Sequence, residues 1–312
     1  MGDFLGKDSG LSILIPAYNE QGGIRRTLEE LLLTLKTLGR PYEVIVINDG
    51  SRDDTATQAA LPGVRVVSHP TNIGYGNALK TGILNATFEW IGIIDADGTY
   101  PCKDIFRLIE QMDKGFNMVV GERVNIHKHD KPFKRVMRKV YKASIRFLAG
   151  NNIRDPNSGF RIFEKRIALE FFDFLCGTFS FTTGLTILAF EKPYFVCYVP
   201  IEYQERVGKS HVRHVRDSIR TMQLIVQGVT YYNPLKFFVL LAVAMVALVG
   251  FPAMCLAMLH LFTLSAYYMI FGCSVSVLLG LGLLGDIIRV TGGKIQRSIA
   301  PVQGMSPSSE QQ

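Results

Sequence analysis

Continuous apolar runs and stretches of helical periodicity alternate along the chain between residues 11 and 121. Continuous apolar runs are typical of buried strands, and they predict strands over residues 11–16, 43–47, 64–68, 91–94 and 118–121. Apolar residues that recur with the helical period predict helices over residues 22–38, 53–60, 73–86 and 105–112. Strands that alternate with helices form βαβ units, so we expect an α/β domain with a mostly parallel sheet.

A different pattern follows, in which basic residues share a helix face. Residues 132–150 predict an amphipathic helix, and its basic face consists of Arg135, Arg138, Lys139, Lys142 and Arg146. This face either lies in solvent or contacts anionic headgroups or an anionic acceptor, and the sequence leaves both open. Further along, we expect a turn and strand over residues 155–163, a helix over residues 181–190 and a strand over residues 195–203.

Two long apolar stretches dominate the C-terminal part. Residues 235–259 carry one charge, Lys236, and residues 262–285 carry none. Each exceeds the ~20 residues that a membrane-crossing helix needs, so we predict two transmembrane helices joined by a short turn near His260. Basic residues flank both open ends of this hairpin, and the positive-inside rule then predicts that both ends are cytoplasmic. Two buried helices of a soluble protein are the alternative.

These patterns divide the chain into four parts. Residues 1–210 are expected to form a cytoplasmic domain, and residues 211–234 a juxtamembrane segment with an amphipathic helix over residues 212–232. Residues 235–290 hold the two transmembrane helices, and residues 291–312, rich in Gly, Ser, Pro and Gln, predict a disordered tail. The first ten residues are polar, so we expect no cleavable signal peptide. The prediction is a multi-pass protein of the inner or plasma membrane.

Composition narrows the possible partners. The 312 residues are 48% apolar, with a mean hydropathy of +0.19, and the apolar excess lies after residue 234. The net charge of +7 and pI of about 9.1 suit phosphates, lipid headgroups or nucleic acid, but no interleaving of aromatic and basic residues supports nucleic acid. Five scattered cysteines without a CxxC pair argue against a disulfide framework and a zinc site, and fit a reducing compartment.

Acidic residues follow three of the predicted strands. Glu20 follows the first strand, Asp49 the second, and Asp95 and Asp97 the fourth. The carboxyl ends of parallel strands meet at one edge, where open α/β sheets bind ligands. Asp95 and Asp97 offer hard oxygen donors that suit Mg²⁺ or Mn²⁺ together with substrate phosphate, although an ordinary Asp-rich turn has the same composition. The chain has no P-loop or GxGxxG fingerprint near these strands, so we predict a nucleoside diphosphate site of another kind.

Several short segments carry a family resemblance. They are IPAYNE (15–20), INDGSRDDT (47–55), NIGYGNALKTG (72–82), DADGTYP (95–101), SGFRIF (158–163), FSFTTGLT (179–186) and YQERVGKS (203–210). In this order, and followed by an apolar hairpin, they resemble the family 2 glycosyltransferases, in particular the dolichol-phosphate mannosyltransferase and bacterial polyprenyl-phosphate glycosyltransferase branch. The resemblance implies a GT-A-type, Rossmann-like fold: a mixed, mostly parallel sheet with flanking helices.

The resemblance also implies roles for individual residues. The nucleotide sugar would contact Pro16, Tyr18, Glu20, Asp49 and Asp95. The metal on the diphosphate would be held by Asp95 and Asp97. The acceptor phosphate would contact Ser158, Arg161, Arg206, Lys209 and Ser210. The residues expected to be catalytic are Asp97, Arg161 and Arg206.

Two departures and two alternatives accompany these roles. Thr99 stands where many relatives carry a metal-contacting Gln, which predicts that water completes the metal shell, and Gly184 replaces a larger residue, which leaves the sugar identity open. Arg161 could instead pair with Asp155 or Glu164. The basic residues from position 206 onward could simply be juxtamembrane charges.

The predicted reaction transfers one hexose-type sugar from a UDP- or GDP-sugar to a polyisoprenyl phosphate, undecaprenyl or dolichyl, at the cytoplasmic membrane face. A phosphate monoester has a second pKa of about 6 and is largely dianionic at pH 7, so the acceptor needs no general base. The metal would stabilise the leaving group, and Arg and Lys would hold the attacking phosphate. The resemblance implies inversion at the anomeric carbon.

Two alternative functions compete with the transfer of a sugar to a polyisoprenyl phosphate. A processive polysaccharide synthase usually carries a Gln-x-x-Arg-Trp motif after its metal site, whereas the single tryptophan here, Trp90, precedes the acidic pair. A membrane-anchored, non-catalytic nucleotide-sugar scaffold would tend to lose the metal carboxylates, which are retained. The sequence decides neither the donor nucleotide and sugar, nor the lipid length and downstream pathway, nor whether the hairpin assembles into a homo-oligomer.

Overall fold

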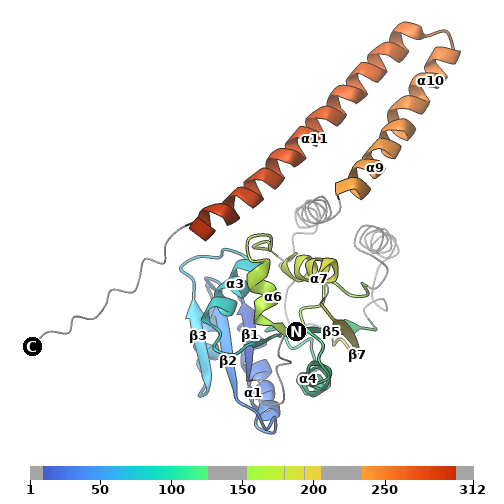
Figure 1. Cartoon of the computed structure of the whole chain (residues 1–312). Helices are drawn as coiled ribbons and strands as arrows, with labels where there is room; N and C mark the ends of the chain where they lie inside the picture. The colour runs from blue at the N-terminus through green and yellow to red at the C-terminus, as the bar shows by residue number, and fades with distance from the viewer. Residues whose placement is uncertain (1–9, 126–152, 179, 193, 205–233, 300–312) are drawn as a thin grey trace, which may run out of the picture. The chain divides into compact units, whose positions relative to one another are not determined.

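The computed structural model describes residues 10–125, 153–178, 180–192, 194–204 and 234–299 (Figure 1). The chain divides into two compact units, Met1–Gly228 and Val229–Gln312. The amphipathic helices expected over residues 132–150 and 212–232 lie outside the described residues, so both stay predictions.

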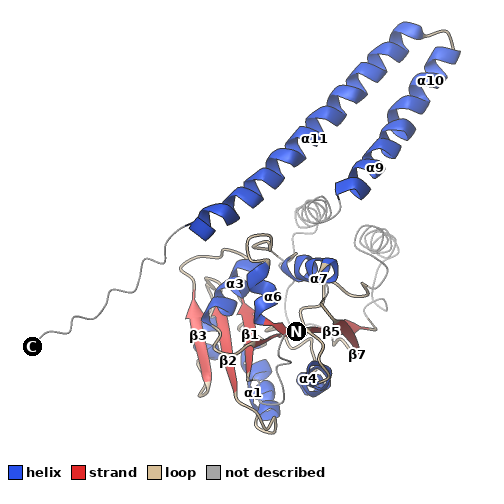
Figure 2. Cartoon of the chain, viewed as in Figure 1, coloured by secondary structure: helices blue, strands red, loops and turns tan. Residues whose placement is uncertain are grey.

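A seven-stranded sheet forms the centre of the first unit (Figure 2). Its strands are β1 (Leu11–Ala17), β2 (Tyr42–Asn48), β3 (Val64–Ser68), β4 (Trp90–Ile93), β5 (Met118–Arg123), β6 (Arg161–Glu164) and β7 (Val196–Ile201). Their order across the sheet is β3-β2-β1-β4-β6-β5-β7. β6 runs antiparallel to its neighbours β4 and β5, and all other neighbouring strands pair in parallel. The predicted mixed, mostly parallel sheet is confirmed.

Helices pack against both faces of this sheet. They are α1 (Ile24–Leu35), α2 (Thr55–Ala59), α3 (Tyr75–Asn85), α4 (Ile105–Asp113), α6 (Lys165–Glu170) and α7 (Phe181–Glu191), with a short 3₁₀ turn η1 (Cys102–Asp104) before α4. The sequence analysis does not predict α6, because a helix of six residues is too short to show a clear helical period. The other helices lie where the periodicity predicts them.

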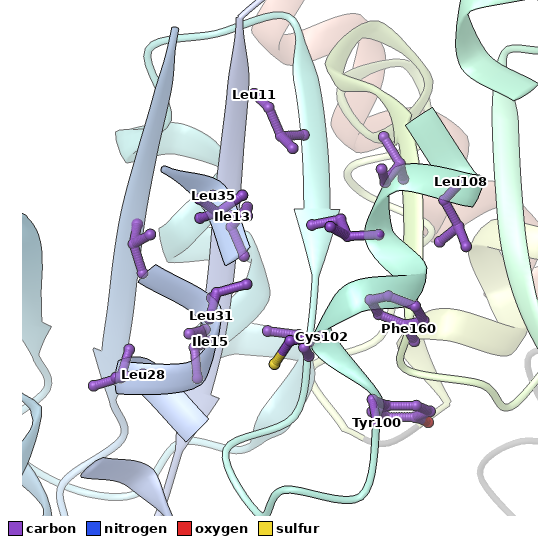
Figure 3. Close-up of a cluster of buried hydrophobic side chains, with 14 of the residues drawn as sticks. Leu11, Ile13, Ile15, Leu28, Leu31, Leu35, Tyr100, Cys102, Leu108 and Phe160 are labelled. Atoms are coloured by element: carbon purple, nitrogen blue, oxygen red, sulfur yellow. The ribbon is translucent and has the colours of Figure 1, made fainter. Parts of the chain in front are cut away.

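A hydrophobic cluster fills the space between one face of the sheet and helices α1 and α4 (Figure 3). Ile13 and Ile15 of β1 are fully buried there together with Leu28 of α1. Successive side chains of a strand point to opposite faces, and Leu14 accordingly lies against Gly82 of α3 on the other side. Both faces of β1 are therefore buried, which explains its continuous apolar sequence.

The second unit is a helical hairpin. Its first arm consists of α9 (Pro234–Met245), a π-helical turn η2 (Val246–Gly250) and α10 (Phe251–Met258), and its second arm is α11 (Phe262–Ile299). The turn falls at His260, as predicted, and His260 adopts a left-handed φ of 60°. The segments Leu241–Met258 and Phe262–Gly282 are long and apolar enough to cross a membrane by length and composition. Only 6% and 0% of their residues are buried, unlike the core helices of a soluble domain.

Side chains of α11 bond to backbone carbonyls of the first arm. Ser265 Oγ donates to the Ala253 carbonyl (2.7 Å), and the Tyr268 hydroxyl donates to the Leu248 carbonyl in the π-helical turn (3.0 Å). Hydrocarbon offers no partner for a free carbonyl, so such bonds suit a hairpin in a membrane.

The start of the expected disordered tail differs from the structure. The sequence analysis expects disorder from residue 291, whereas α11 continues to Ile299. An established helix gains one hydrogen bond for each added residue, so it can extend through residues of modest helix propensity. Residues 300–312 lie outside the described residues.

Candidate active site

Three acidic residues follow strands that lie close together in the sheet. Asp49 follows β2, Asp95 and Asp97 follow β4, and β1 lies between these two strands. The three strands are parallel, so their carboxyl ends share one edge, at which open α/β sheets bind ligands. The strand order thus brings the predicted donor-binding and metal-binding carboxylates to the same edge.

Asp95 is half-buried, and two distant parts of the chain contact its carboxylate. The Tyr75 hydroxyl, at the start of α3, donates a hydrogen bond to Asp95 Oδ1 (3.0 Å). Gly159 lies against the same carboxylate, since a Cβ at this glycine would lie 2.8 Å from each of the two oxygens. Burial, and then the Asp95 charge, raise the pKa of Tyr75 well above its usual value, so its hydroxyl stays protonated and donates at neutral pH.

Asp97 is buried and is held within its own turn. The Thr99 hydroxyl donates to Asp97 Oδ1 (2.6 Å), and the Thr99 N–H donates to the same oxygen (3.2 Å). Gly98 makes this turn possible with a φ of 71°, a conformation that glycine adopts at little cost. Thr99, which stands where many relatives of the resembled family carry Gln, therefore orients a carboxylate.

The two carboxylates fit a hard divalent cation. Asp95 and Asp97 each accept a hydrogen bond from a hydroxyl group, an arrangement that orients carboxylate oxygens for a metal. Within the described residues, no group of three or more His, Cys, Asp or Glu side chains could hold a metal ion. A cation here would therefore also need oxygens from water or from a bound diphosphate, and Mg²⁺ is usually bound in this way.

Asp49 is buried, and its carboxylate binds donors of the protein itself. Oδ1 accepts from the Ile73 N–H (3.0 Å), and Oδ2 accepts from the Gly74 N–H (2.8 Å). His69 Nδ1 lies 2.8 Å from Oδ1, and its Nε2 lies 3.0 Å from the Thr81 hydroxyl. Asp49 thus fixes the loop that leads into α3, a structural role that the sequence analysis does not predict.

The loops after β1 and β2 are bonded to each other. Asn19, with a left-handed φ of 54°, donates through its N–H to Ser51 Oγ (3.0 Å) and accepts from the Arg52 N–H (2.8 Å). The Glu20 N–H donates to the Thr55 hydroxyl (2.8 Å). These bonds hold Tyr18 and Glu20, two residues predicted to contact the nucleotide, at the carboxyl edge of the sheet, next to the buried Pro16.

Arg161 is fully buried, and its guanidinium is used inside the protein. Its nitrogen atoms donate five hydrogen bonds, to the carbonyls of Pro156, Ser158 (twice) and Thr182 and to the Thr186 hydroxyl. A guanidinium has five N–H groups, so its donors are fully engaged. Burial lowers the pKa of Arg161, although an arginine remains charged in proteins.

The predicted roles of Arg161 therefore need correction. All five N–H groups of its guanidinium already donate inside the protein, so Arg161 has no free donor for an acceptor phosphate. The alternative ion pairs are also wrong, because Asp155 pairs with Arg123 (2.8 Å) and Glu164 pairs with Arg166. The side chain instead joins the segment before β6 to helix α7.

Ser158 has a buried hydroxyl without a hydrogen-bond partner. The residue is fully buried, and within the described part of the chain no donor or acceptor pairs with its Oγ. Leaving a buried hydroxyl unpaired costs about 1–3 kcal/mol, so we expect an oxygen atom of a bound ligand to be its partner. The next residue, Gly159, contacts the Asp95 carboxylate and donates its N–H to the Tyr100 hydroxyl (2.8 Å).

Aromatic and charged residues also contact one another next to the Asp97 turn. The Arg123 guanidinium forms a two-pronged ion pair with Asp155 (2.8 Å for both bonds) and lies 5.4 Å from the Tyr203 ring centre. The Tyr203 ring meets the Tyr100 ring edge to face, 5.2 Å between centres. The Gln204 N–H donates to the Thr99 carbonyl (2.8 Å), which ties the last residues before position 205 to the Asp97 turn.

Three residues at this edge escape the sequence analysis, namely Tyr75, Arg123 and Asp155. Tyr75 lies in the NIGYGNALKTG segment, but nothing in that segment indicates that its hydroxyl would reach Asp95. Arg123 ends β5 and Asp155 lies in the segment before β6, and two opposite charges in such places are too common to predict a pair. The predicted acceptor residues Arg206, Lys209 and Ser210 lie outside the described residues, so their roles stay predictions.

Known sequences and structures are similar to this chain over most of its length. Residues 12–172 match the family described as Glycosyl transferase family 2. An undecaprenyl-phosphate 4-deoxy-4-formamido-L-arabinose transferase of Klebsiella pneumoniae is 30% identical over 295 residues, 89% of this chain and 88% of the relative. A dolichyl-phosphate beta-glucosyltransferase of Trichomonas vaginalis is 29% identical over 243 residues, 71% of each chain.

A solved structure supports the fold. The glucosyl-3-phosphoglycerate synthase of Mycobacterium tuberculosis, in complex with Mn²⁺, UDP and phosphoglyceric acid, superposes with a TM-score of 0.59, covering 71% of this chain and 78% of the other. The two sequences are 20% identical, so this likeness bears on the fold alone. It agrees with the GT-A-type fold that the family resemblance implies.

Proposed function

The chain belongs to glycosyl transferase family 2 and is a glycosyltransferase, and we propose that it transfers one sugar from a nucleoside diphosphate sugar to a polyisoprenyl phosphate. The names of the two relatives describe transfer to undecaprenyl phosphate and to dolichyl phosphate. Both relatives align with most of this chain, so the same class of acceptor is the simplest proposal.

One structural observation carries this proposal. Gly159 packs its backbone against the Asp95 carboxylate, and the adjacent Ser158 has a buried hydroxyl without a protein partner. The predicted metal site and one predicted acceptor contact are thus neighbours in the fold, although 63 positions separate Asp95 and Ser158 in the sequence (158 − 95). A sugar transferase needs this proximity because the donor diphosphate and the attacking phosphate meet at one carbon.

On the donor side, we assign the nucleoside to the bonded loops after β1 and β2. Pro16, Tyr18 and Glu20 lie there. An aromatic side chain can stack on a base, and a carboxylate can accept hydrogen bonds from the N–H groups of the base or from the ribose hydroxyls. Asp49 belongs to the same edge, where it fixes the Ile73–Gly74 backbone and contributes its negative charge.

Asp95 and Asp97 would hold Mg²⁺ or Mn²⁺ on the donor diphosphate. The cation would neutralise charge that develops on the departing nucleoside diphosphate. Thr99 orients the Asp97 carboxylate, and the pair Asp95 and Asp97 leaves coordination positions for diphosphate oxygens and water. The structural relative, solved with Mn²⁺ and UDP, provides a precedent for this combination on the same fold.

On the acceptor side, Ser158 would donate its hydroxyl to the phosphate. Gln204 is bonded to Thr99, and Arg206 follows only two residues later. We assign Arg206, Lys209 and Ser210 to the same phosphate. Arg161 acts indirectly, since its guanidinium donates a hydrogen bond to the Ser158 carbonyl.

The chemistry follows from these placements. An oxygen of the dianionic acceptor phosphate forms a bond to the anomeric carbon, while the bond from that carbon to the donor diphosphate breaks and its electron pair leaves with the nucleoside diphosphate. No proton is removed from the nucleophile, so the site needs no general base. The basic side chains hold two anionic groups together against their repulsion, and the predicted single displacement inverts the anomeric centre.

The hairpin completes the proposal. Its two apolar segments would cross the membrane, and the flanking basic residues predict that the catalytic unit lies on the cytoplasmic side.

A transfer assay with the full chain in detergent tests the function. Radiolabelled UDP- and GDP-sugars are offered with undecaprenyl or dolichyl phosphate, with Mn²⁺ or Mg²⁺ and with EDTA. We expect one donor to yield a labelled lipid that EDTA abolishes. A labelled lipid that forms equally well with EDTA would contradict the metal assignment. Nucleotide-sugar binding without any labelled lipid would contradict the acceptor class and favour a scaffold.

A further inference from the structure

Tyr75 occupies a position that the proposed chemistry has not yet explained. It is the first residue of α3, it lies 20 positions before Asp95, and its hydroxyl donates to Asp95 Oδ1 (3.0 Å). The side chain therefore joins a helix start to the carboxylate that follows β4. Because this bond reaches a proposed metal ligand, how firmly Tyr75 is held matters for the site.

Two sets of backbone hydrogen bonds hold the segment around Tyr75. Before it, the N–H groups of Ile73 and Gly74 donate to the Asp49 carboxylate (3.0 and 2.8 Å). After it, the N–H groups of Gly76 and Asn77 donate to the Gly177 carbonyl (3.1 and 3.2 Å). The segment is thus bonded on one side to the end of β2 and on the other to the loop before α7.

The contact with that loop leaves no space for side chains. A Cβ at Gly76 would lie 2.1 Å from the Cys176 carbonyl oxygen, and a Cβ at Gly74 would lie 2.5 Å from the Gly177 carbonyl oxygen. Both clashes involve backbone atoms, which cannot turn aside as a side chain can. The start of α3 and residues 176–177 therefore pack backbone against backbone, which fixes the origin of the Tyr75 side chain.

We propose that Tyr75 is a positioning residue that sets the orientation in which the Asp95 carboxylate meets the divalent cation of the donor complex. The inference rests on the proposed function, since that function includes a cation at Asp95. A hydrogen bond from a fixed hydroxyl restricts rotation of the carboxylate, and partners of this kind commonly change metal affinity or activity by 10–100-fold. Tyr75 would act through Asp95, without contact to the reacting atoms.

Another tyrosine supplies a matched control. The Tyr194 hydroxyl donates to Glu170 Oε2 (2.6 Å), so it also makes a tyrosine–carboxylate bond. That bond is exposed and joins the loop after α7 to the end of α6, apart from the carboxyl edge that holds Asp95. Tyr75→Phe and Tyr194→Phe therefore remove the same chemical group from a proposed metal ligand and from an ordinary surface carboxylate.

The test measures Mn²⁺ binding to the full chain in detergent by electron paramagnetic resonance, with the nucleoside diphosphate of the donor that supports transfer. We expect Tyr75→Phe to weaken Mn²⁺ binding about 10-fold or more. Transfer at saturating Mn²⁺ should recover most of the wild-type kcat, so the defect should appear in the Mn²⁺ concentration for half-maximal rate. Tyr194→Phe should match the wild type in both, and thermal unfolding should show that both variants are folded.

The outcomes separate this inference from the function beneath it. A wild-type chain that neither binds Mn²⁺ nor needs it for transfer would overturn the proposed function and this inference with it. A metal-dependent wild type whose Mn²⁺ affinity is unchanged by Tyr75→Phe would overturn the inference alone. An equal loss of affinity in Tyr75→Phe and Tyr194→Phe would also count against it, because the effect would then lack any specificity for Asp95.

Discussion

Glu43 at the amino edge of the sheet and the pair Asp95 and Asp97 at the carboxyl edge are held by different kinds of partner. At the amino edge, Glu43 accepts bonds from the Ser12 hydroxyl (2.6 Å) and the Thr87 N–H (2.5 Å), and it pairs with Arg65 (3.1 Å). At the carboxyl edge, Asp95 and Asp97 each accept a bond from a neutral hydroxyl.

The difference shows how environment separates structure from function. Glu43 joins the starts of β1, β2 and β4, and its charge is balanced by a fixed arginine. A carboxylate oriented by hydroxyl groups keeps its negative charge, which a cation can then use. The comparison predicts that substitutions of Asp95 and Asp97 change activity more than stability, and that substitution of Glu43 does the reverse.

Asp97→Asn should have the largest effect on activity. The substitution removes a negative charge from the proposed cation site while it preserves side-chain size. We expect about a 10³-fold loss of kcat, which corresponds to roughly 4 kcal/mol of transition-state stabilisation. The transfer assay measures this loss, and circular dichroism should show wild-type thermal unfolding. Transfer within a few-fold of the wild type would contradict the assignment of Asp97 to the metal.

Arg161→Lys should have the largest effect on stability. Lysine keeps the charge but cannot satisfy all the acceptors that surround the guanidinium, and each buried acceptor left unpaired costs about 1–3 kcal/mol. We expect a loss of about 3 kcal/mol in the free energy of unfolding, measured by denaturant titration. Arg25→Lys, at an exposed helix pair, should change it by less than ~0.5 kcal/mol.

The Arg161 variant also tests whether Arg161, which lies at the carboxyl edge, contacts the acceptor phosphate. Normal stability combined with a higher KM for the lipid phosphate would restore the original prediction of a phosphate contact. Lower stability with a nearly unchanged KM would support the structural role.

Thr99→Val should have an intermediate effect. Valine has nearly the same shape but cannot donate to Asp97 Oδ1, so the carboxylate loses one orienting bond. We expect Mn²⁺ to bind about 10-fold more weakly in the presence of nucleoside diphosphate, measured by titration calorimetry. Thr37→Val, at an exposed helix end, is the control and should bind Mn²⁺ like the wild type. Unchanged affinity in Thr99→Val would show that Asp97 needs no orientation by this hydroxyl.

Glu43→Gln should have the smallest effect, confined to stability. We expect a loss of about 1 kcal/mol at pH 7 and normal transfer. Partial burial alone would raise the pKa of Glu43, but the hydrogen bonds from Ser12 and Thr87 and the Arg65 charge outweigh it, so the pKa is lowered from 4.5. The stabilisation is therefore present above pH 4.5 and is lost as the pH falls through the lowered pKa of the folded protein.

Thermal unfolding between pH 3 and pH 7 checks the Glu43 prediction. The difference between wild type and Glu43→Gln should shrink as the pH falls below 4.5. A difference that stays constant with pH would mean that the carboxylate charge does not contribute. A large loss of transfer at pH 7 would contradict the division between the two edges.

The local pattern of the sequence predicted much of this molecule. Apolar runs and helical periods identified β1 to β7, α1 to α4, α7 and the apolar hairpin, because each depends on neighbouring residues only. The positions of Asp95 and Asp97 after an apolar strand, within a series of short motifs, also predicted the family. These features do not depend on the order of the strands in the sheet, so they can be inferred before the fold is known.

The tertiary structure alone decided how the site is supported. β6 enters the sheet antiparallel between β4 and β5, and this placement lays Gly159 against Asp95. Tyr75 reaches Asp95 across 20 positions, and Arg161 reaches Thr186 across 25. Such contacts depend on strand order and on the packing of distant segments, which no local period encodes. Residue type made Arg161 a plausible phosphate ligand, but burial and five internal hydrogen bonds made it a structural residue.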